Sequence, residues 1–331
     1  MPENIIHKYR GLIEEGLQAL PFQKKPDSLY KPCRYILENG GKRIRPVLTL
    51  ITCGLCRGEL AQAVDAAIAI ELTHNFTLVH DDIMDQAESR RGKTSIHVKW
   101  DDSTAILAGD ELFVQACRQL TRYSADSSYT PEQIHLLYST FFESVHTVCE
   151  GQAFDMEYGK RATVITTKEY LEMIRGKTVA LLRGSMIMGG IVADAEEEEL
   201  HRLGEIADSV GLAFQIQDDV LDLIADPDKF GKQRGGDIRE GKMTYPMLLG
   251  LERGNETDRN QLLEVMKSSD VTDSDIDQTI DLLNRYSVIK SVREVIDSYY
   301  QTAFRVINRF GDSVYKEDLI NLIHFLKNRD Y

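Results

Sequence analysis

Two strings with the pattern Asp-Asp-x-x-Asp stand far apart in the chain, each within an apolar stretch that favours a helix. Their carboxylates are Asp81, Asp82 and Asp85 in the first string and Asp218, Asp219 and Asp222 in the second. Because helical side chains four residues apart lie on one face, each string stacks its outer carboxylates one turn apart. Such like charges repel one another unless cations lie between them. Mg²⁺ fits this arrangement, since it takes few protein carboxylates and completes its shell with water and substrate phosphates.

A solvated acidic turn is the alternative interpretation of either string alone. Both strings, however, follow segments rich in apolar residues, 76–80 (FTLVH) and 213–217 (AFQIQ), whereas a helix face meant for water would be polar. If the two helices face each other, they would hold a cluster of Mg²⁺ ions, and that cluster would hold a diphosphate.

Lysine and arginine clusters provide candidate partners for phosphate groups. The segment 40–46 (GGKRIRP) places Lys42 and Arg45 at a helix start, where a bound anion would offset their repulsion with the helix dipole. Arg90 and Arg91 follow the first string in a polar loop, and their guanidinium groups suit bidentate phosphate binding. Three further lysines lie between apolar residues or in glycine-rich segments: Lys177, Lys232 and Lys242. Solvated surface charge is the alternative for each cluster, and Lys177 could extend its amine along the surface to water.

The stretch 61–86 is nearly all apolar and therefore predicts a buried helix. On a wheel of about 100° per residue, Ile70, His74 and Leu78 fall on the side of Asp81 and Asp85. That side would form a pocket wall, charged at one end and apolar further in. A buried histidine is commonly a core residue with a satisfied hydrogen bond, but His74 shares the aspartate face and is therefore a candidate site residue.

Most of the chain has the apolar periodicity of helices joined by short polar segments. We expect helices over residues 3–20, 28–38, 47–58, 61–86, 101–123, 131–160, 168–189 and 203–224, with more between 247 and 331. The alternation that would indicate a sheet is absent, so the predicted fold class is all-α. No linker rich in Pro, Gly or Ser interrupts the chain, and the candidate site draws on distant segments. We therefore expect one domain over residues 1–331.

The composition bounds the class of protein. A net charge of −14 over 331 residues argues against a nucleic-acid partner. Five scattered cysteines, an odd number, favour reduced thiols and a cytoplasmic location. The polar start predicts no signal peptide, and no apolar run reaches transmembrane length, so we expect no stable membrane insertion.

Together, the carboxylates and cations predict a phosphorylated ligand with an apolar tail. The cations outnumber what one diphosphate needs, so two diphosphates fit better, one held by metal ions and one by basic side chains. No Ser-His-Asp triad or activated cysteine is evident. The chemistry that these residues favour is therefore metal-assisted departure of a diphosphate.

With its motifs in this order, the sequence resembles the trans-isoprenyl diphosphate synthases, also called polyprenyl synthetases, over essentially its whole length. The motifs are 40–46, 81–85 with Arg90-Arg91, Gly151-Gln152, Lys177-Thr178, Phe214-Gln215 before 218–222, and the lysines at 232 and 242. The resemblance implies a helical bundle around a central active-site cavity and a homodimer. It also implies condensation of isopentenyl diphosphate with an allylic diphosphate, with release of diphosphate.

The resemblance further assigns roles to residues. Two or three Mg²⁺ ions would bind Asp81, Asp82, Asp85, Asp218, Asp219 and Asp222. The allylic diphosphate or its leaving group would contact Arg90, Lys177, Thr178, Gln215, Lys232 and Lys242. Isopentenyl diphosphate would bind Lys42, Arg45, His74 and Arg91. The residues expected to carry catalysis are Asp81, Asp82, Asp85, Arg90, Lys177, Asp218 and Lys232.

Product length is expected to depend on residues just before the first string. In this family, large side chains there block chain growth, and the chain has Phe76 and Thr77 five and four positions before Asp81. This pattern resembles geranylgeranyl diphosphate synthases, which make a twenty-carbon product. An ideal wheel puts Thr77 nearer the aspartate face and Phe76 about 140° away, so the role of Phe76 rests on the resemblance. Farnesyl or longer polyprenyl products are the alternatives.

Three rival functions remain. A class I terpene cyclase shares the first string, but it usually has a mixed Asn/Ser/Glu motif at the second and needs no isopentenyl site at Lys42 and Arg45. A non-catalytic subunit of a heteromeric synthase would have lost one or both strings, whereas both are intact here. An unrelated Mg²⁺-dependent diphosphate hydrolase is the third.

Overall fold

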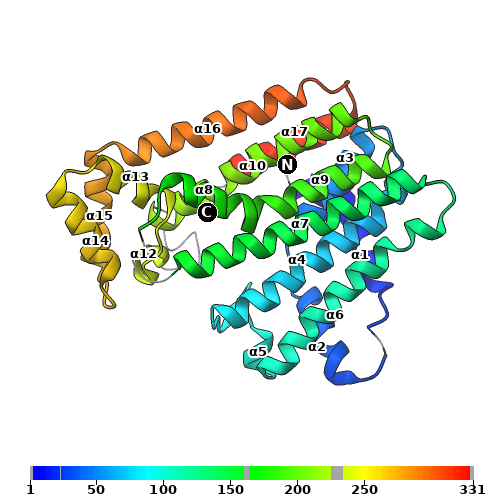
Figure 1. Ribbon diagram of the computed structural model, residues 1–331, viewed down its shortest axis with the longest axis horizontal. Coiled ribbons are helices and arrows are strands. Elements are labelled where there is room, and N and C mark those ends of the chain that lie inside the picture. The colour runs from blue at the N-terminus through cyan, green and yellow to red at the C-terminus, as the bar shows by residue number, and fades with distance from the viewer. Residues whose placement is uncertain (1–2, 23, 160–163, 225–233, 329–331) are drawn as a thin grey trace. The chain divides into compact units, whose positions relative to one another are not determined.

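A computed structural model describes residues 3–22, 24–159, 164–224 and 234–328. Helices make up most of this part of the chain, which confirms the all-α prediction (Figure 1). The helices before residue 160 are α1 (Glu3–Gln18), α2 (Asp27–Glu38), α3 (Ile44–Leu55), the 3-10 turn η1 (Leu60–Ala63), α4 (Val64–Met84), α5 (Ile96–Lys99), α6 (Asp102–Leu120), the 3-10 turn η2 (Tyr123–Ala125) and α7 (Pro131–Tyr158). The later ones are α8 (Thr167–Ile174), the π-helical segment η3 (Arg175–Val179), α9 (Ala180–Val192), α10 (Glu197–Ile224), α12 (Gly236–Glu240), α13 (Tyr245–Arg253), α14 (Glu256–Lys267), α15 (Asp273–Arg285), α16 (Val288–Ile307) and α17 (Val314–Lys327).

Contacts between residues divide the chain into two compact units. The first unit comprises Met1–Val145, Arg183–Gly204 and Phe310–Leu322. The second comprises His146–Leu182, Glu205–Arg309 and Ile323–Tyr331. The expectation of a single domain stays a prediction.

Helix α4 is the central helix of the first unit, where it lies along α6 and also contacts α1 and α3 (Figure 1). Its side chains from Ala66 to Leu72 are almost completely buried, as the apolar pattern predicted. Close packing on α6 depends on Gly109, because a Cβ atom there would lie 2.3 Å from Nε2 of His80. The small residues of α4 and α6 thus bring the two backbones together.

In the second unit, α13 is surrounded by α8, α14, α15 and α16. Side-chain caps fix where three of these helices begin. Thr166 and Glu169 form a reciprocal capping box at α8, and Thr272 and Asp275 form another at α15. Asn255 caps α14 by accepting a hydrogen bond from the Asp258 amide. Such caps satisfy amide groups that a helix start leaves without partners.

Several element boundaries differ from the predictions. The helix expected over 168–189 is divided into α8, η3 and α9. The helix expected from 203 begins at Glu197, because consecutive acidic residues favour a helix N-terminus. At the other end of the predicted 61–86 helix, α4 ends at Met84, since Gln86 takes a positive φ.

The polar loop expected after the first aspartate string contains a two-stranded hairpin. Strands β1 (Ser89–Arg90) and β2 (Lys93–Thr94) pair antiparallel. The intervening Arg91 and Gly92 have φ values of 54° and 73°. Two consecutive positive φ angles match the twist of a tight hairpin turn. The strands are too short to give the alternating pattern by which a sheet is recognised in a sequence.

Candidate active site

The segment before α3 has three residues in uncommon backbone conformations. Gly40, Gly41 and Arg43 have φ values of 71°, 140° and 50°. A Cβ atom on Gly41 would lie 2.7 Å from Nη1 of Arg91, and the same guanidinium donates to the Gly40 carbonyl. The two glycines therefore provide both the turn and the space for Arg91.

Arg43 is held inside the first unit. Its guanidinium forms an ion pair with Glu71 of α4, and both side chains are almost completely buried. It also donates to the Leu37 carbonyl over 2.6 Å. Asn75 donates to the same Glu71 carboxylate over 2.8 Å. Arg43 thus fixes the backbone between Lys42 and Arg45, which explains why segment 40–46 has a third cation between these two.

Arg45, His74 and Arg91, three of the residues expected to bind isopentenyl diphosphate, lie close together. Nη1 of Arg45 is 3.3 Å from Nε2 of His74. Burial, then the charges of Arg45 and Arg91, hold the pKa of His74 well below its usual value. Burial also lowers the pKa of Arg45 to about 10, although the Glu71 charge opposes this. A neutral His74 can accept a hydrogen bond from Arg45, which leaves the cluster cationic.

The three carboxylates of the first string differ in their surroundings. Asp82 is buried, and it forms an ion pair with Nε of Arg90 on β1. Asp81 is half-buried, and Asp85 is exposed at the C-cap of α4. The Asp82 pair orients Arg90 and fixes the end of α4, so Asp81 and Asp85 are the more accessible candidates for a metal ion. Lys42 is exposed.

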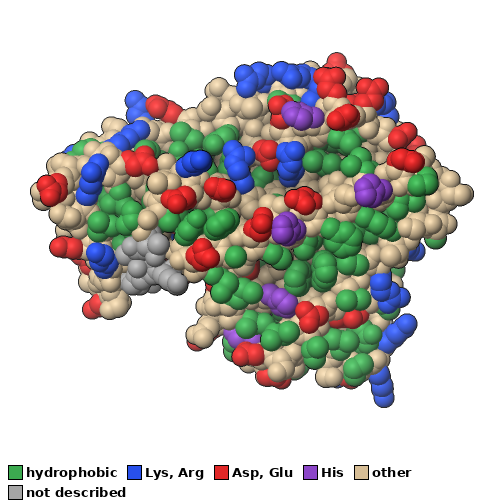
Figure 2. Space-filling view, viewed as in Figure 1, with side chains coloured by type: hydrophobic (Ala, Val, Ile, Leu, Met, Phe, Trp, Pro, Cys, Tyr) green, Lys and Arg blue, Asp and Glu red, His purple; other side chains and the backbone are tan. Residues whose placement is uncertain are grey.

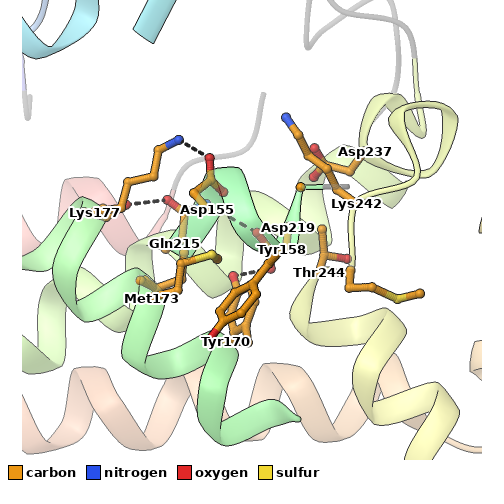
Figure 3. Close-up of a pocket in the computed structure, with 14 residues that line it drawn as sticks. Asp155, Tyr158, Tyr170, Met173, Lys177, Gln215, Asp219, Asp237, Lys242 and Thr244 are labelled. Atoms are coloured by element: carbon orange, nitrogen blue, oxygen red, sulfur yellow. Dashed lines mark hydrogen bonds and ion pairs between the residues drawn. The ribbon is translucent and has the colours of Figure 1, made fainter. Parts of the chain in front are cut away.

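A pocket in the second unit holds most of the remaining candidates (Figure 3). Its lining residues are Asp155, Tyr158, Gly159, Tyr170, Met173, Ile174, Lys177, Thr178, Gln215, Asp219, Asp237, Lys242, Met243 and Thr244. We call it the Lys177 pocket. Figure 3 shows Lys177 and Lys242 on opposite sides of it. Lys177 pairs with Asp155 over 2.6 Å, and Lys242 pairs with Glu240 over 2.6 Å.

Two glycines position Lys177. A Cβ atom on Gly151 of α7 would lie 2.1 Å from the Lys177 amide nitrogen, and one on Gly176 would lie 2.7 Å from the Gly151 Cα atom. The backbones of α7 and η3 therefore touch where the helix widens into a π turn. π turns are rare and often occur at functional sites. This contact places Lys177 next to Asp155, one turn further along α7.

Asp219 of the second string is buried and accepts three hydrogen bonds. Its carboxylate accepts hydrogen bonds from the Tyr170 hydroxyl at 2.5 Å, the Tyr245 amide at 3.0 Å and the Gln215 amide at 3.3 Å. Thr178 donates in turn to Gln215. Burial, and then the charge of Asp237, raise the pKa of Asp219 to about 7. These contacts suit a residue that orients its neighbours as well as one that binds a cation.

The other two carboxylates of that string lie on the same helix. Asp222 accepts from the Asp237 amide over 3.0 Å, and its carbonyl accepts from the Gly235 amide over 2.7 Å. It thereby anchors the start of α12. Asp218 stands beside Asp219 on α10. Lys232 lies outside the described residues.

The two strings fall in different units, so the expectation that they face each other stays a prediction. Among the described residues, no three His, Cys, Asp or Glu side chains are grouped closely enough to enclose a metal ion.

The structure adds residues that the sequence did not single out. Tyr170, Asp237 and Thr244 line the Lys177 pocket, and Asp155 pairs with Lys177. The sequence could have indicated Asp155, because it lies four residues after Gly151 on the same helix face. No sequence pattern could have indicated Tyr170, since only the packing of α8 brings it to Asp219.

A helical fold with two carboxylate strings and clustered cations is typical of a class of enzymes that use diphosphates. A model of the polyprenyl synthetase family matches residues 26–283, and the chain belongs to that family. It is a trans-prenyltransferase, more specifically an isoprenyl diphosphate synthase. Family members use divalent metal ions with diphosphate substrates, namely isopentenyl diphosphate and an allylic diphosphate.

Similar proteins agree with this assignment. A short chain isoprenyl diphosphate synthase of Methanocaldococcus jannaschii is 43% identical over 85% of this chain and 82% of its own length. A geranylgeranyl diphosphate synthase of Methanosarcina mazei is 33% identical over 96% of this chain and 95% of its own. The crystal structure of a geranylgeranyl pyrophosphate synthetase from Pyrococcus horikoshii matches with a TM-score of 0.90 and 38% identity, covering 98% and 97% of the two chains. No helix in the described ranges has the length and apolar character needed to span a bilayer.

Proposed function

We propose that this enzyme makes geranylgeranyl diphosphate by adding isopentenyl diphosphate to an allylic diphosphate. The observation that carries the product length is the environment of Phe76. Its ring contacts His80, one turn further along α4, and Phe113 of α6, with ring centroids 4.9 Å and 5.3 Å away. Phe113 in turn stacks on Phe141 with centroids 6.3 Å apart. Packed aromatic rings of this kind resist displacement, which suits a fixed stop for a growing chain.

Thr77 suits that role less well. Its hydroxyl donates to the His74 carbonyl over 2.9 Å, within its own helix. The side chain is small. We therefore assign the stop to Phe76, although a helical wheel places Thr77 nearer the aspartate face.

The Lys177 pocket would hold the allylic diphosphate. Its volume of about 170 Å³ is below the roughly 300–1,000 Å³ of typical small-molecule pockets, so it suits a head group better than a whole substrate. Lys177 and Lys242 would contact that head group, with Lys232, Thr178 and Gln215 as further contacts. Mg²⁺ on Asp81, Asp85 and Asp218, when bound, would neutralise charge that develops on the leaving diphosphate.

The cationic cluster of Arg45 and Arg91, with Lys42 and His74, would hold isopentenyl diphosphate. Binding at a second site positions its double bond for attack. The C–O bond of the allylic substrate breaks, which releases diphosphate and leaves an allylic cation. The double bond of isopentenyl diphosphate attacks this cation, a new C–C bond forms, and a proton is lost. Arg90, held by Asp82, would add positive charge beside the departing group. Apolar walls such as Met173 and Ile174 would keep water from the cation.

We also propose that the enzyme is a homodimer, in which α6 and the first half of α7 form the interface. Large apolar side chains there are 43–57% exposed, namely Ile106, Leu107, Val114, Leu136 and Phe142. Figure 2 shows hydrophobic side chains gathered over these helices. Exposed apolar patches on a stable fold commonly mark a protein interface.

Product analysis tests the proposed activity. The purified enzyme is incubated with Mg²⁺, isopentenyl diphosphate and, separately, dimethylallyl, geranyl or farnesyl diphosphate, and the dephosphorylated products are sized. We expect a dominant twenty-carbon alcohol. A product of thirty carbons or more would contradict the assigned length, and failure to elongate any primer would contradict the activity itself.

A further inference from the structure

A second cavity lies in the first unit, where the C-terminal ends of α1 and α2 meet. Its volume is about 410 Å³, within the usual range for a small-molecule pocket. Leu17, Leu20, Phe22 and Leu37 form an apolar floor, and each is at least nine-tenths buried. Part of this lining precedes residue 26, where the match to the family model begins.

The rim of this cavity favours a cation. Gln18 and Glu38 are the last residues of α1 and α2, so the negative ends of two helix dipoles reach it. Neither helix has a basic residue in its last turn. Glu38 adds an exposed carboxylate to this rim. Glu14 also lines the cavity but is already paired with Arg10 and Arg43, and the guanidinium of Arg34 donates to the Phe22 carbonyl. A carboxylate at a helix C-terminus is itself unfavourable, and a bound cation would offset that repulsion.

The cavity also contacts the segment that carries the isopentenyl site. Glu14 lies 3.5 Å from Nε of Arg43, and the Leu37 carbonyl accepts from Nη2 of the same residue over 2.6 Å. Both residues line the cavity. A ligand that shifts Glu14 or Leu37 would therefore act on Arg43 and, through its backbone, on Lys42 and Arg45.

We propose that this cavity binds a small amphiphilic amine, with its ammonium group at Glu38 and the C-terminal ends of α1 and α2, and its apolar body on the leucine and phenylalanine floor. Occupancy changes the affinity of the enzyme for isopentenyl diphosphate through Arg43. The binding site is independent of the proposed function, and only this kinetic effect rests on it.

Binding is tested with three probes of matched size. These are 4-phenylbutylamine, 4-phenylbutanol and 4-phenylbutanoate, each titrated into the full-length enzyme and followed by calorimetry or ligand-observed NMR. We expect saturable binding of the amine, with the alcohol weaker and the carboxylate weakest. Equal binding of all three, or no saturable binding of the amine, would overturn the proposal.

Variants locate the site. Glu38→Gln should weaken amine binding about threefold to fivefold, as expected for one partly exposed ion pair. Gln18→Trp should fill the cavity and weaken the amine and the alcohol together. Glu15→Gln removes an exposed carboxylate from α1 outside the cavity and serves as the matched control. Identical amine affinity in Glu38→Gln and Glu15→Gln would place the ligand elsewhere.

Kinetic measurements test the coupling to the isopentenyl diphosphate site separately from amine binding. Saturating amine should change the KM for isopentenyl diphosphate at least about twofold, well within the range of known coupling energies. The KM for the allylic substrate should stay unchanged, and Glu38→Gln should lessen the effect at the same amine concentration. Confirmed binding without a change in either KM would overturn the coupling through Arg43. An equal change in the KM values for both substrates would contradict coupling by way of Arg43.

Discussion

At the scale of single residues, the site depends on charges that hold other charges in place. Glu71 is the buried partner of Arg43, and its negative charge also counteracts the effect of burial on Arg45 and Arg91. In the same unit, Asp82 holds Arg90. A buried ion pair contributes little net stability, but the loss of one partner leaves the other charge without compensation.

Glu71→Gln should therefore destabilise the fold markedly. We expect the free energy of unfolding to fall by about 3 kcal/mol or more, because Arg43 stays charged and buried. Glu198→Gln is the control, since Glu198 pairs with Arg202 on the surface and should cost about 0.5 kcal/mol or less. Urea denaturation measures both, and equal stability of the two variants would rule out Glu71 as the structural counter-charge.

The raised pKa of Asp219 predicts a pH dependence of stability in the metal-free enzyme. Burial moves this pKa from its ordinary 3.8 to about 7, so the folded state binds a proton that the unfolded state has already lost. The contribution of Asp219 is thus present below pH 3.8 and is lost as the pH rises towards 7. Wild-type enzyme in a chelator should lose more stability over this window than Asp219→Asn. Parallel pH profiles for the two proteins would show that Asp219 is ionised throughout.

At the scale of elements, the π-helical segment η3 positions two of the groups that we propose to contact the allylic diphosphate. Gly176 and Gly151 allow α7 and η3 to touch, and this contact brings Lys177 to Asp155 and Thr178 to Gln215. The widened turn shifts the register of the following helix, so the two side chains point into the pocket from one edge.

Gly176→Ala should disrupt this arrangement, because the new Cβ atom would lie 2.7 Å from the Gly151 Cα atom. We expect kcat/KM for the allylic substrate to fall by about tenfold to a hundredfold as Lys177 is displaced. Gly11→Ala is the matched control, since nothing lies within 4 Å of that position and alanine favours a helix. Steady-state kinetics with both variants test this prediction. Unchanged kinetics in Gly176→Ala would show that the contact with Gly151 does not position Lys177.

Local sequence predicted much at this scale, and the failures have physical causes. The helices and the burial of α4 followed from apolar periodicity. The π turn could not be predicted, because it arises from contact between Gly151 and Gly176, which lie 25 residues apart. Periodicity also treated the three aspartates of a string as equals, whereas burial and Arg90 make Asp82 different. The cations of segment 40–46 were likewise similar in sequence, whereas burial and contacts with Glu71 and the Leu37 carbonyl distinguish Arg43.

At the scale of the whole molecule, the account predicts an assembly and a product. The apolar side chains on α6 and α7 are suited to a second copy of the chain, since an interface with two-fold symmetry uses the same patch twice. Leu107 is the most exposed of the group, at 57%.

Leu107→Glu should weaken the dimer by burying a charge without a partner. Light scattering after size-exclusion chromatography should give a dimer for the wild type and a larger monomer fraction for the variant. Val314→Glu changes a residue that is 51% exposed on another helix and should leave the dimer intact. A wild-type monomer at micromolar concentration would refute the proposed interface.

The most direct test of the central claim is product length in the wild type, Phe76→Ala and Phe304→Ala. Phe304 packs against His324 with ring centroids 4.6 Å apart, so its loss matches the removal of the Phe76 ring from His80 at 4.9 Å. With farnesyl diphosphate, isopentenyl diphosphate and Mg²⁺, we expect a twenty-carbon product from the wild type and Phe304→Ala. Phe76→Ala should give products of twenty-five carbons or more. An unchanged product from an active Phe76→Ala enzyme would contradict the assignment of Phe76 as the stop for chain growth.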